Sequence, residues 1–349
     1  MQEICLIRAN REMVGGAEIY LGRLATSLEA RGIRYTRIHS PLPRKMPTWL
    51  AVLLFNAYLC LRKKGRFYFS LERITCPDIY RAGDGVHRCY LNMEKKSRIN
   101  PLHSIYLYLE KRCFHNASRI IANSQMVKEQ IIETYHISPA KISVVYNGVP
   151  VVPDDWVVPR AFCDEFSLNG TERVVLFVGS GFRRKGVFEF LELISRLQTP
   201  SFRAFIVGKD KKIDYYKRVA MNMGLAEKVV FTGSRADVAN FYAISDLLVL
   251  PTRYDPFANV TIEAMSYNTA VVTTKQNGAH EILDPDFVMA HPRDYRIVPV
   301  IDALLQDRKK LTAIKRKNRK IARGFSLDRN VEETMRVVAG VQARRLGSS

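Results

Sequence analysis

The chain has 349 residues, which is long for one domain and sufficient for two, and 47% of them are hydrophobic, enough for two packed cores. Its formal net charge of +20 favours an anionic partner, such as nucleic acid, a phospholipid surface or a phosphorylated substrate. The longest apolar run, residues 49–61, is too short to cross a bilayer, and we expect no signal peptide because Glu3 and Arg8 bracket only four apolar residues.

Strands and helices alternate along the first half of the chain. The pattern predicts a buried strand over 3–9, a helix over 17–32 opened by Gly15 and Gly16, and an extended stretch with a glycine turn over 73–86. A strand and a long amphipathic helix follow over 117–137, and a further strand spans 141–149.

The apolar run 49–61 has two interpretations. It is followed by the basic sequence RKKGR (62–66), which is typical of a helix that lies in a membrane interface. A buried helix of the first domain fits the run equally well. The first 150 residues carry a net charge of +12 and the remainder +8, so the first half is the more basic part per residue.

The six cysteines form no CxxC pair and no zinc-like spacing with histidine. We therefore expect six reduced thiols and a cytoplasmic protein.

Three prolines in residues 150–160 indicate a linker between domains. A second alternation follows, with strands expected over 173–180, 203–208, 228–233, 246–251 and 270–274 and helices between them. The sequence thus predicts an α/β protein with two Rossmann-like, doubly wound domains facing across a cleft, residues 1–155 and 156–329. The last segment, 330–349, is expected to be a helix, and packing against the first domain is one option for it.

The loop GSGFRRKG (179–186) joins a buried strand to a helix. Its glycines allow a ligand to approach the backbone, and Arg184 and Lys185 suit a diphosphate. A solvated basic loop is the alternative. The spacing fits neither a Walker A motif nor the GxGxxG fingerprint.

The stretch RYDPFANVTIEA (253–264) also leads from a buried strand into a helix. Asp255 and Glu263 flank the helix N-terminus, which favours anions. One ligand with a hydroxyl-rich face and a phosphorylated face would fit this arrangement, and so would a capped surface helix with two solvated acids.

These motifs together resemble the retaining glycosyltransferases of family 4, which have the two-domain GT-B fold. The family's two acids, separated by seven residues, correspond to Asp255 and Glu263, with PFANVTI between them. Asp255 is shorter than the usual Glu, and Ala258 replaces a glycine. Residues 277–283 resemble the family's loop near the donor. Within that family, GSGFRRKGV (179–187) and YRAGDGVHRCYL (80–91) resemble the lipopolysaccharide inner-core hexosyltransferases that glucosylate the core heptose.

The resemblance implies a set of site residues. Catalytic roles fall to Asp84, Arg184, Lys185 and Asp255, and His87 is a candidate on the acceptor side, although turn capping and a structural role are the alternatives for Asp84 and His87. The implied donor-binding residues are Gly15, Gly16, Arg184, Lys185, Asp255, Phe257, Ala258, Asn259, Val260 and Glu263.

The function implied by the resemblance is metal-independent transfer of a hexose, with retention, from a nucleotide sugar such as UDP-glucose to a lipopolysaccharide core or other envelope glycolipid. No cofactor or nucleic acid is expected, and the enzyme would contact the anionic inner face of the plasma membrane from the cytoplasm. The alternatives are a sugar-nucleotide epimerase on the same fold, a basic nucleic-acid-binding protein and a non-catalytic relative.

Overall fold

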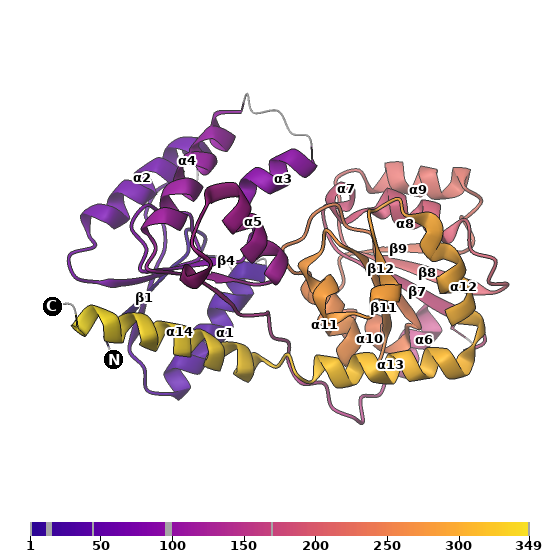
Figure 1. Ribbon diagram of the computed structural model, residues 1–349. Coiled ribbons are helices and arrows are strands. Elements are labelled where there is room, and N and C mark those ends of the chain that lie inside the picture. The colour runs from indigo at the N-terminus through magenta and orange to yellow at the C-terminus, as the bar shows by residue number, and fades with distance from the viewer. Residues whose placement is uncertain (1, 12–15, 44, 95–99, 169, 348–349) are drawn as a thin grey trace. The chain divides into compact units, whose positions relative to one another are not determined.

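The computed structural model describes residues 2–11, 16–43, 45–94, 100–168 and 170–347 (Figure 1). The chain forms two compact units by its internal contacts: residues 1–148 together with 327–349, and residues 149–326. The chain therefore leaves unit 1 at residue 148 and returns to it at residue 327.

Unit 1 contains a parallel six-stranded sheet in the order β2-β1-β3-β4-β5-β6. Its strands are β1 (Ile4–Ile7), β2 (Tyr35–Ile38), β3 (Phe67–Ser70), β4 (Ile79–Ala82), β5 (Arg119–Ala122) and β6 (Ile142–Val144). Its helices are α1 (Gly16–Ala30), α2 (Thr48–Leu61), α3 (His87–Met93), α4 (Pro101–Asn116), α5 (Gln125–Tyr135) and α14 (Leu327–Gly347), with a 3-10 turn at Pro139–Lys141.

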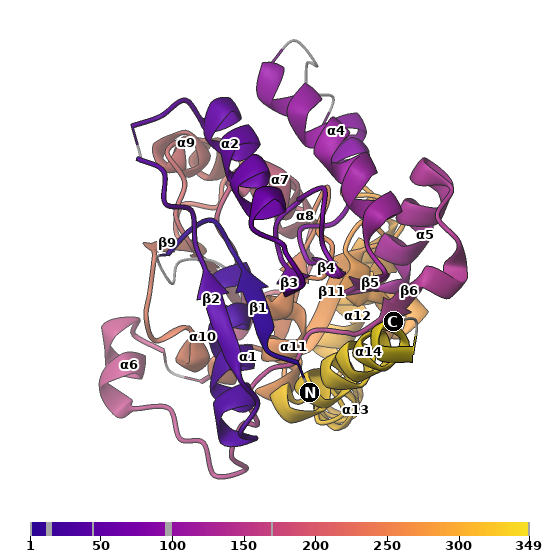
Figure 2. The ribbon, with the colours of Figure 1, turned by 90° about the vertical axis from the view of Figure 1, so that its left-hand side faces the viewer.

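Side chains of unit 1 alternate between the two faces of this sheet. One face packs against α1 and α14, which supply Leu21, Leu24, Val331 and Val338 to its core. The other face is covered by α2, α4 and α5, as Figures 1 and 2 show. The central strands β1 and β3 are buried on both faces, which explains why their sequences are mostly apolar rather than alternating, whereas the edge strand β2 is partly exposed.

Two cysteines of unit 1 correct an expectation from the sequence. Cys60, near the end of α2, and Cys76, in the loop after β3, form a disulfide with a Cα–Cα distance of 5.8 Å. The prediction of six reduced thiols is therefore wrong, because the fold brings together two cysteines whose 16-residue spacing matches no motif. The cytoplasmic localisation inferred from those thiols loses this support and stays a prediction.

Unit 2 contains a second parallel six-stranded sheet, in the order β12-β11-β10-β7-β8-β9. Its strands are β7 (Arg173–Val178), β8 (Phe202–Val207), β9 (Val229–Gly233), β10 (Leu247–Leu250), β11 (Ala270–Thr274) and β12 (Val288–Met289). Its helices are α6 (Arg160–Glu165), α7 (Phe182–Lys185), α8 (Val187–Ile194), α9 (Ile213–Asn222), α10 (Val238–Ile244), α11 (Asn259–Ser266), α12 (Val298–Gln306) and α13 (Arg308–Ala322), with 3-10 turns at Gly278–Ile282, Pro285–Phe287 and Tyr295–Ile297.

The order of the strands positions the loops of unit 2. Because β10 lies between β7 and β11, and all three run parallel, the loops that leave their carboxyl ends are neighbours at one edge of the sheet. The predicted α/β class with two doubly wound sheets is confirmed. Within the described ranges, no helix is long and apolar enough to cross a membrane.

Candidate functional site

The loop after β7 folds into the short helix α7, which carries Arg184 and Lys185. Gly186 ends this helix with φ 85°, and a Cβ at that position would stand only 2.0 Å from the carbonyl oxygen of Pro251. Only glycine allows the cationic loop and the loop after β10 to approach this closely. The contact is reinforced by the Arg184 carbonyl, which accepts hydrogen bonds from the backbone N–H of Arg253 at 2.9 Å and from the Thr252 hydroxyl at 3.1 Å.

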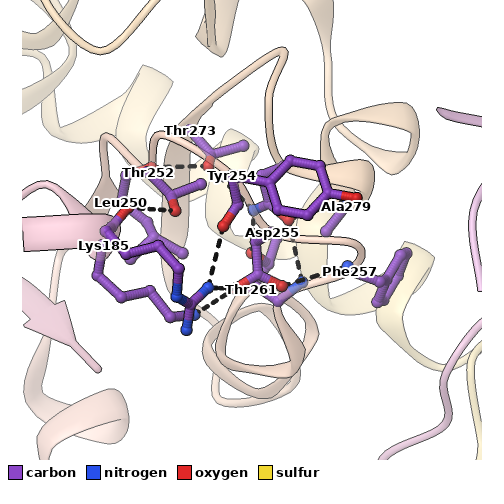
Figure 3. Close-up of polar contacts among 12 residues, drawn as sticks. Lys185, Leu250, Thr252, Tyr254, Asp255, Phe257, Thr261, Thr273 and Ala279 are labelled. Carbon is purple, nitrogen blue, oxygen red and sulfur yellow. Dashed lines mark hydrogen bonds and ion pairs between the residues drawn. The ribbon is translucent and has the colours of Figure 1, made fainter. Parts of the chain in front are cut away.

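The carboxylate of Asp255 is the point on which the two cations converge. Its Oδ2 atom accepts hydrogen bonds from Lys185 Nζ at 2.5 Å and from Arg184 Nη1 at 3.1 Å (Figure 3). Its Oδ1 atom accepts from the backbone N–H of Phe257 at 3.2 Å. Arg184 also donates to the Tyr254 carbonyl, at 2.9 Å. The sequence predicts each of these loops between a buried strand and a helix, and the structure brings their side chains into direct contact.

The ionisation of Asp255 follows from this environment. Burial by itself raises the pKa of the carboxyl, but Lys185 and Arg184 more than offset burial, so the pKa lies below its ordinary value. The side chain of Lys185 is 11% exposed and that of Arg184 is 35% exposed. Two cations that share a single carboxylate leave a local excess of positive charge, which suits a dianionic diphosphate.

Asn277 organises this edge, and sequence reasoning gave it no individual role. Its Oδ1 atom accepts hydrogen bonds from the backbone N–H groups of Ala258 (3.0 Å) and Ala279 (3.1 Å). Its Nδ2 atom donates to the hydroxyls of Thr261 and Thr273, at 3.2 and 3.0 Å. The side chain is fully buried, so it ties the start of α11 to β11 and the loop that follows. The signals in the sequence were the Asn-Gly dipeptide at 277–278 and the resemblance of residues 277–283 to the family's loop near the donor.

The residues between the two acids lie at the start of α11. Phe257 and Ala258 are buried, and Asn259 and Val260 form the half-buried first positions of the helix. Ala258 has φ −73° and ψ 107°, an ordinary extended conformation. The backbone there does not require glycine, so the alanine fits without strain.

Glu263 lies one turn further along α11. Its Oε2 atom accepts a hydrogen bond from the hydroxyl of Tyr242, on α10, at 2.9 Å. Burial and then the charge of Glu263 raise the pKa of Tyr242 well above its ordinary value, so the phenol stays a hydrogen-bond donor. The tyrosine holds the carboxylate in one position, and no sequence pattern indicated this contact.

The remaining predicted site residues belong to unit 1. Gly15 lies outside the described residues, while Gly16 is the exposed first residue of α1. Asp84 is exposed in the loop after β4, with its Oδ2 atom 3.6 Å from Arg8 Nη1. Arg8 also pairs with Glu18 at 2.8 Å and with Glu72 at 3.3 Å. Three carboxylates thus surround one guanidinium at the end of β1.

His87 is held by several contacts at the start of α3. Its Nε2 atom lies 3.2 Å from His103 Nδ1, and its ring packs against Tyr90 and Tyr106. Its backbone N–H donates to the buried Glu110 carboxylate at 2.7 Å. These contacts supply a structural role for His87, and the acceptor-side role stays a prediction.

A metal centre would require a cluster of His, Cys, Asp or Glu side chains among the described residues. Within those ranges, no group of three His, Cys, Asp or Glu side chains is placed to hold a metal ion. Metal independence stays a prediction. Its physical basis is that Arg184 and Lys185 can balance the charge of a diphosphate.

Two family models match the chain. Residues 162–321 match the glycosyl transferases group 1 model, and residues 81–152 match the glycosyltransferase family 4 model. The first match covers the loops with Arg184, Lys185, Asp255 and Glu263, and the second covers Asp84 and His87.

Curated relatives match about half of the chain. A D-inositol 3-phosphate glycosyltransferase of Mycobacteroides abscessus is 30% identical over 179 residues, which is 48% of this chain and 39% of the relative. An uncharacterised glycosyltransferase of Methanocaldococcus jannaschii is 27% identical over 176 residues, 48% of this chain and 45% of the relative. The matched part therefore spans less than half the length of each of these relatives.

Solved structures match the fold over nearly the whole chain. WaaG, a glycosyltransferase involved in lipopolysaccharide biosynthesis, has a TM-score of 0.81 at 19% identity, with 97% of this chain and 100% of WaaG covered. Anabaena HepE, in complex with UDP and glucose, has a TM-score of 0.74 at 19% identity, with 97% and 100% covered. At this identity the two structures support the architecture of the chain.

Proposed function

The chain carries the domains of the group 1 and family 4 glycosyltransferases on the GT-B fold, and from this premise we propose that it moves a hexose from a nucleotide sugar to a glycolipid of the cell envelope. UDP-glucose is the donor we favour, and the lipopolysaccharide core is the acceptor. The transfer retains the anomeric configuration and takes place at the cytoplasmic face of an anionic membrane. Two proteins of similar structure support these choices: HepE was solved with UDP and glucose, and WaaG is involved in lipopolysaccharide biosynthesis.

The observation that carries the proposal is the convergence of Arg184 and Lys185 on Asp255 at the start of α11. In the proposed complex the two cations bind the diphosphate and stabilise the charge that develops as it leaves. Preorganised donors of this kind each typically lower a barrier by about 3 kcal/mol. Asp255 then contacts the hexose hydroxyls, and Glu263, held by Tyr242, accepts hydrogen bonds from the ribose diol.

Calorimetric titration with UDP-, GDP- and ADP-hexoses in the presence of EDTA tests the donor. We expect selective binding of one UDP-hexose without metal. Absence of binding to every donor would overturn the proposed site. Turnover of the bound donor without an added acceptor would instead point to an epimerase.

The acceptor is tested separately, with radiolabelled donor and lipopolysaccharide truncated at successive core sugars. We expect label to be incorporated into only one truncated form. Donor hydrolysis with no incorporation into any form would refute the proposed acceptor class.

A further inference from the structure

Residues 30–71 form a segment that is rich in basic and apolar residues and contains no acid. These 42 residues contain nine Lys and Arg and no Asp or Glu, in a chain where a quarter of all residues are charged. Helix α2 lies in the middle of the segment and Arg62, Lys63, Lys64 and Arg66 follow it. Lys63 is paired with Asp78 at 2.9 Å, so its charge is balanced within the protein.

Helix α2 exposes apolar side chains and turns a polar one inward. Phe55 and Leu59 are buried against the sheet, but Trp49 is 41%, Leu54 40% and Leu61 79% exposed. Asn56 instead accepts hydrogen bonds from the backbone N–H and the hydroxyl of Thr75, at 2.7 and 3.1 Å. A surface helix normally places its polar residues outward. The sequence left an interfacial and a buried helix as equal options, and the exposed apolar side chains favour the interfacial one.

Helix α4 packs beside α2 and extends the same surface (Figures 1 and 2). It exposes Tyr108, 55% accessible, with the Arg112 guanidinium 6.0 Å from the ring centroid. Lys111 is exposed as well. The one acid of this helix, Glu110, is fully buried and bound to Arg73. The outer surface of α4 is therefore cationic and aromatic.

A basic pocket of about 390 Å³ lies beside α2, against β1, β2 and β3. Its cationic lining includes Arg11, Arg62 and Arg66, and His39 lies among them. Glu3 is the acid in the lining and accepts a hydrogen bond from Thr36. The Arg62 guanidinium stacks 4.6 Å from the Tyr58 ring centroid and donates to its hydroxyl, which fixes it at the junction of the pocket and the apolar face.

We propose that the exposed face of α2 and the basic pocket together form a docking surface for an anionic phospholipid membrane. Trp49, Leu54 and Leu61 insert at the level of the headgroups, and Arg62 and Arg66 bind lipid phosphates. The charge of the segment favours a membrane as the partner, because 42 residues without an acid are complementary to an anionic leaflet. This surface makes the membrane contact of the proposed function. It rests on that function only because a membrane-bound acceptor requires such a contact.

Vesicle sedimentation tests the apolar half of the surface. The full chain is spun with vesicles of phosphatidylcholine alone and of an equimolar mixture with phosphatidylglycerol. We expect binding to the mixed vesicles only, and a loss of about tenfold or more in the Leu54→Glu, Leu61→Glu double variant. The matched control is Val157→Glu, because Val157 is 80% exposed in unit 2. Equal binding by the double variant and the parent chain would overturn the proposal.

The cationic half has its own variants, Arg62→Gln and Arg66→Gln, which remove charge without altering the apolar face. We expect weaker binding to mixed vesicles and a smaller loss when salt is raised. If these variants had the same salt dependence as the parent chain, the basic pocket would not belong to the docking surface.

Tryptophan fluorescence reports insertion directly. The chain has two tryptophans, so a Trp156→Phe background leaves Trp49 as the probe. We expect the emission of Trp49 to shift to the blue with mixed vesicles, and the absence of a shift would refute insertion.

Sedimentation velocity tests for a competing occupant. A dimer of the parent chain that Leu61→Glu dissociates would assign the exposed face of α2 to a second copy of the chain. Donor calorimetry on the same variants separates the two proposals, because donor binding should be unchanged when vesicle binding is lost.

Discussion

Replacing Asp255 by Asn tests whether this carboxylate competes with a diphosphate for Lys185 and Arg184. The amide keeps the shape of the side chain but removes the negative charge between Lys185 Nζ and Arg184 Nη1. In the parent chain, a diphosphate must share or displace this carboxylate. In the variant both cations are available to the diphosphate, although the free protein carries their unbalanced charge.

The expected loss of stability in the Asn variant follows from the burial of the Asp255 ion pairs. Removing one partner of a buried ion pair costs about 3–5 kcal/mol, and the lower end applies here because the Arg184 side chain is 35% exposed. For a domain the size of unit 2, about 3 kcal/mol corresponds to a decrease in Tm of roughly 6–12 °C. The folded-state pKa of Asp255 lies below its ordinary value. The parent chain therefore loses this stabilisation as the pH falls through that pKa. The difference in Tm between the parent chain and the Asn variant becomes smaller in acid.

Thermal unfolding with and without UDP is the assay. At one fixed UDP concentration we expect a larger rise in Tm for the Asn variant than for the parent chain, with a Kd for UDP lower by about tenfold, or 1.4 kcal/mol. UDP-hexose should gain less than UDP does, because the variant also loses a sugar contact.

The control is Asp246→Asn, at the opposite end of the same sheet. Asp246 lies 3.5 Å from Lys315 and 3.9 Å from Arg173. This variant should be destabilised without any change in the shift produced by UDP. A UDP shift in the Asp255 variant equal to or smaller than that of the parent chain would refute the reasoning.

Three further predictions concern other residues. Lys185→Ala should lower kcat by about two orders of magnitude, and single-turnover kinetics that show an unchanged chemical step would contradict this. Glu263→Gln should weaken donor binding, whereas Tyr242→Phe should weaken it less, since it removes a positioning contact; calorimetry ranks them, and the reverse order would contradict the assignment. Reducing the Cys60–Cys76 disulfide should destabilise unit 1 by about 3 kcal/mol, given its 16-residue loop; thiol titration of the denatured, unreduced chain should find four thiols, and six would exclude the bond.

Most strands of the two sheets could be predicted because they are short apolar runs bounded by turn residues, but β2, β3 and β12 were not predicted. The strand expected over 246–251 corresponds to β10, with each limit shifted by one residue, and the helix expected to follow it is α11. The loops at the carboxyl ends of these strands could be located from the same pattern. The direct ion pairs of Asp255 could not, because they join residues 70 positions apart in the chain.

Other elements carried weaker signals. Helix α4 was not predicted, although Asn100 caps it and Pro101 occupies its first position, which together are typical of a helix start. Its buried Glu110 was not anticipated, because a carboxylate that is fully buried beside Arg73 looks like any surface acid in the sequence. The helix α13 was missed because its sequence is dominated by lysine and arginine, with few buried positions.

The return of the chain at residue 327 has a consequence for folding during synthesis. Helix α14 supplies Val331, Met335, Val338 and Val341 to a core whose other members include Ile4, Leu6 and Leu21. The ribosome therefore completes all of unit 2 before the residues that close one wall of unit 1 are made. Domains usually fold in the order of their synthesis, but here residues 1–148 must wait, with apolar surface uncovered, for α14, which is made after unit 2. Unit 1 consequently has the longer exposure to chaperones and to aggregation.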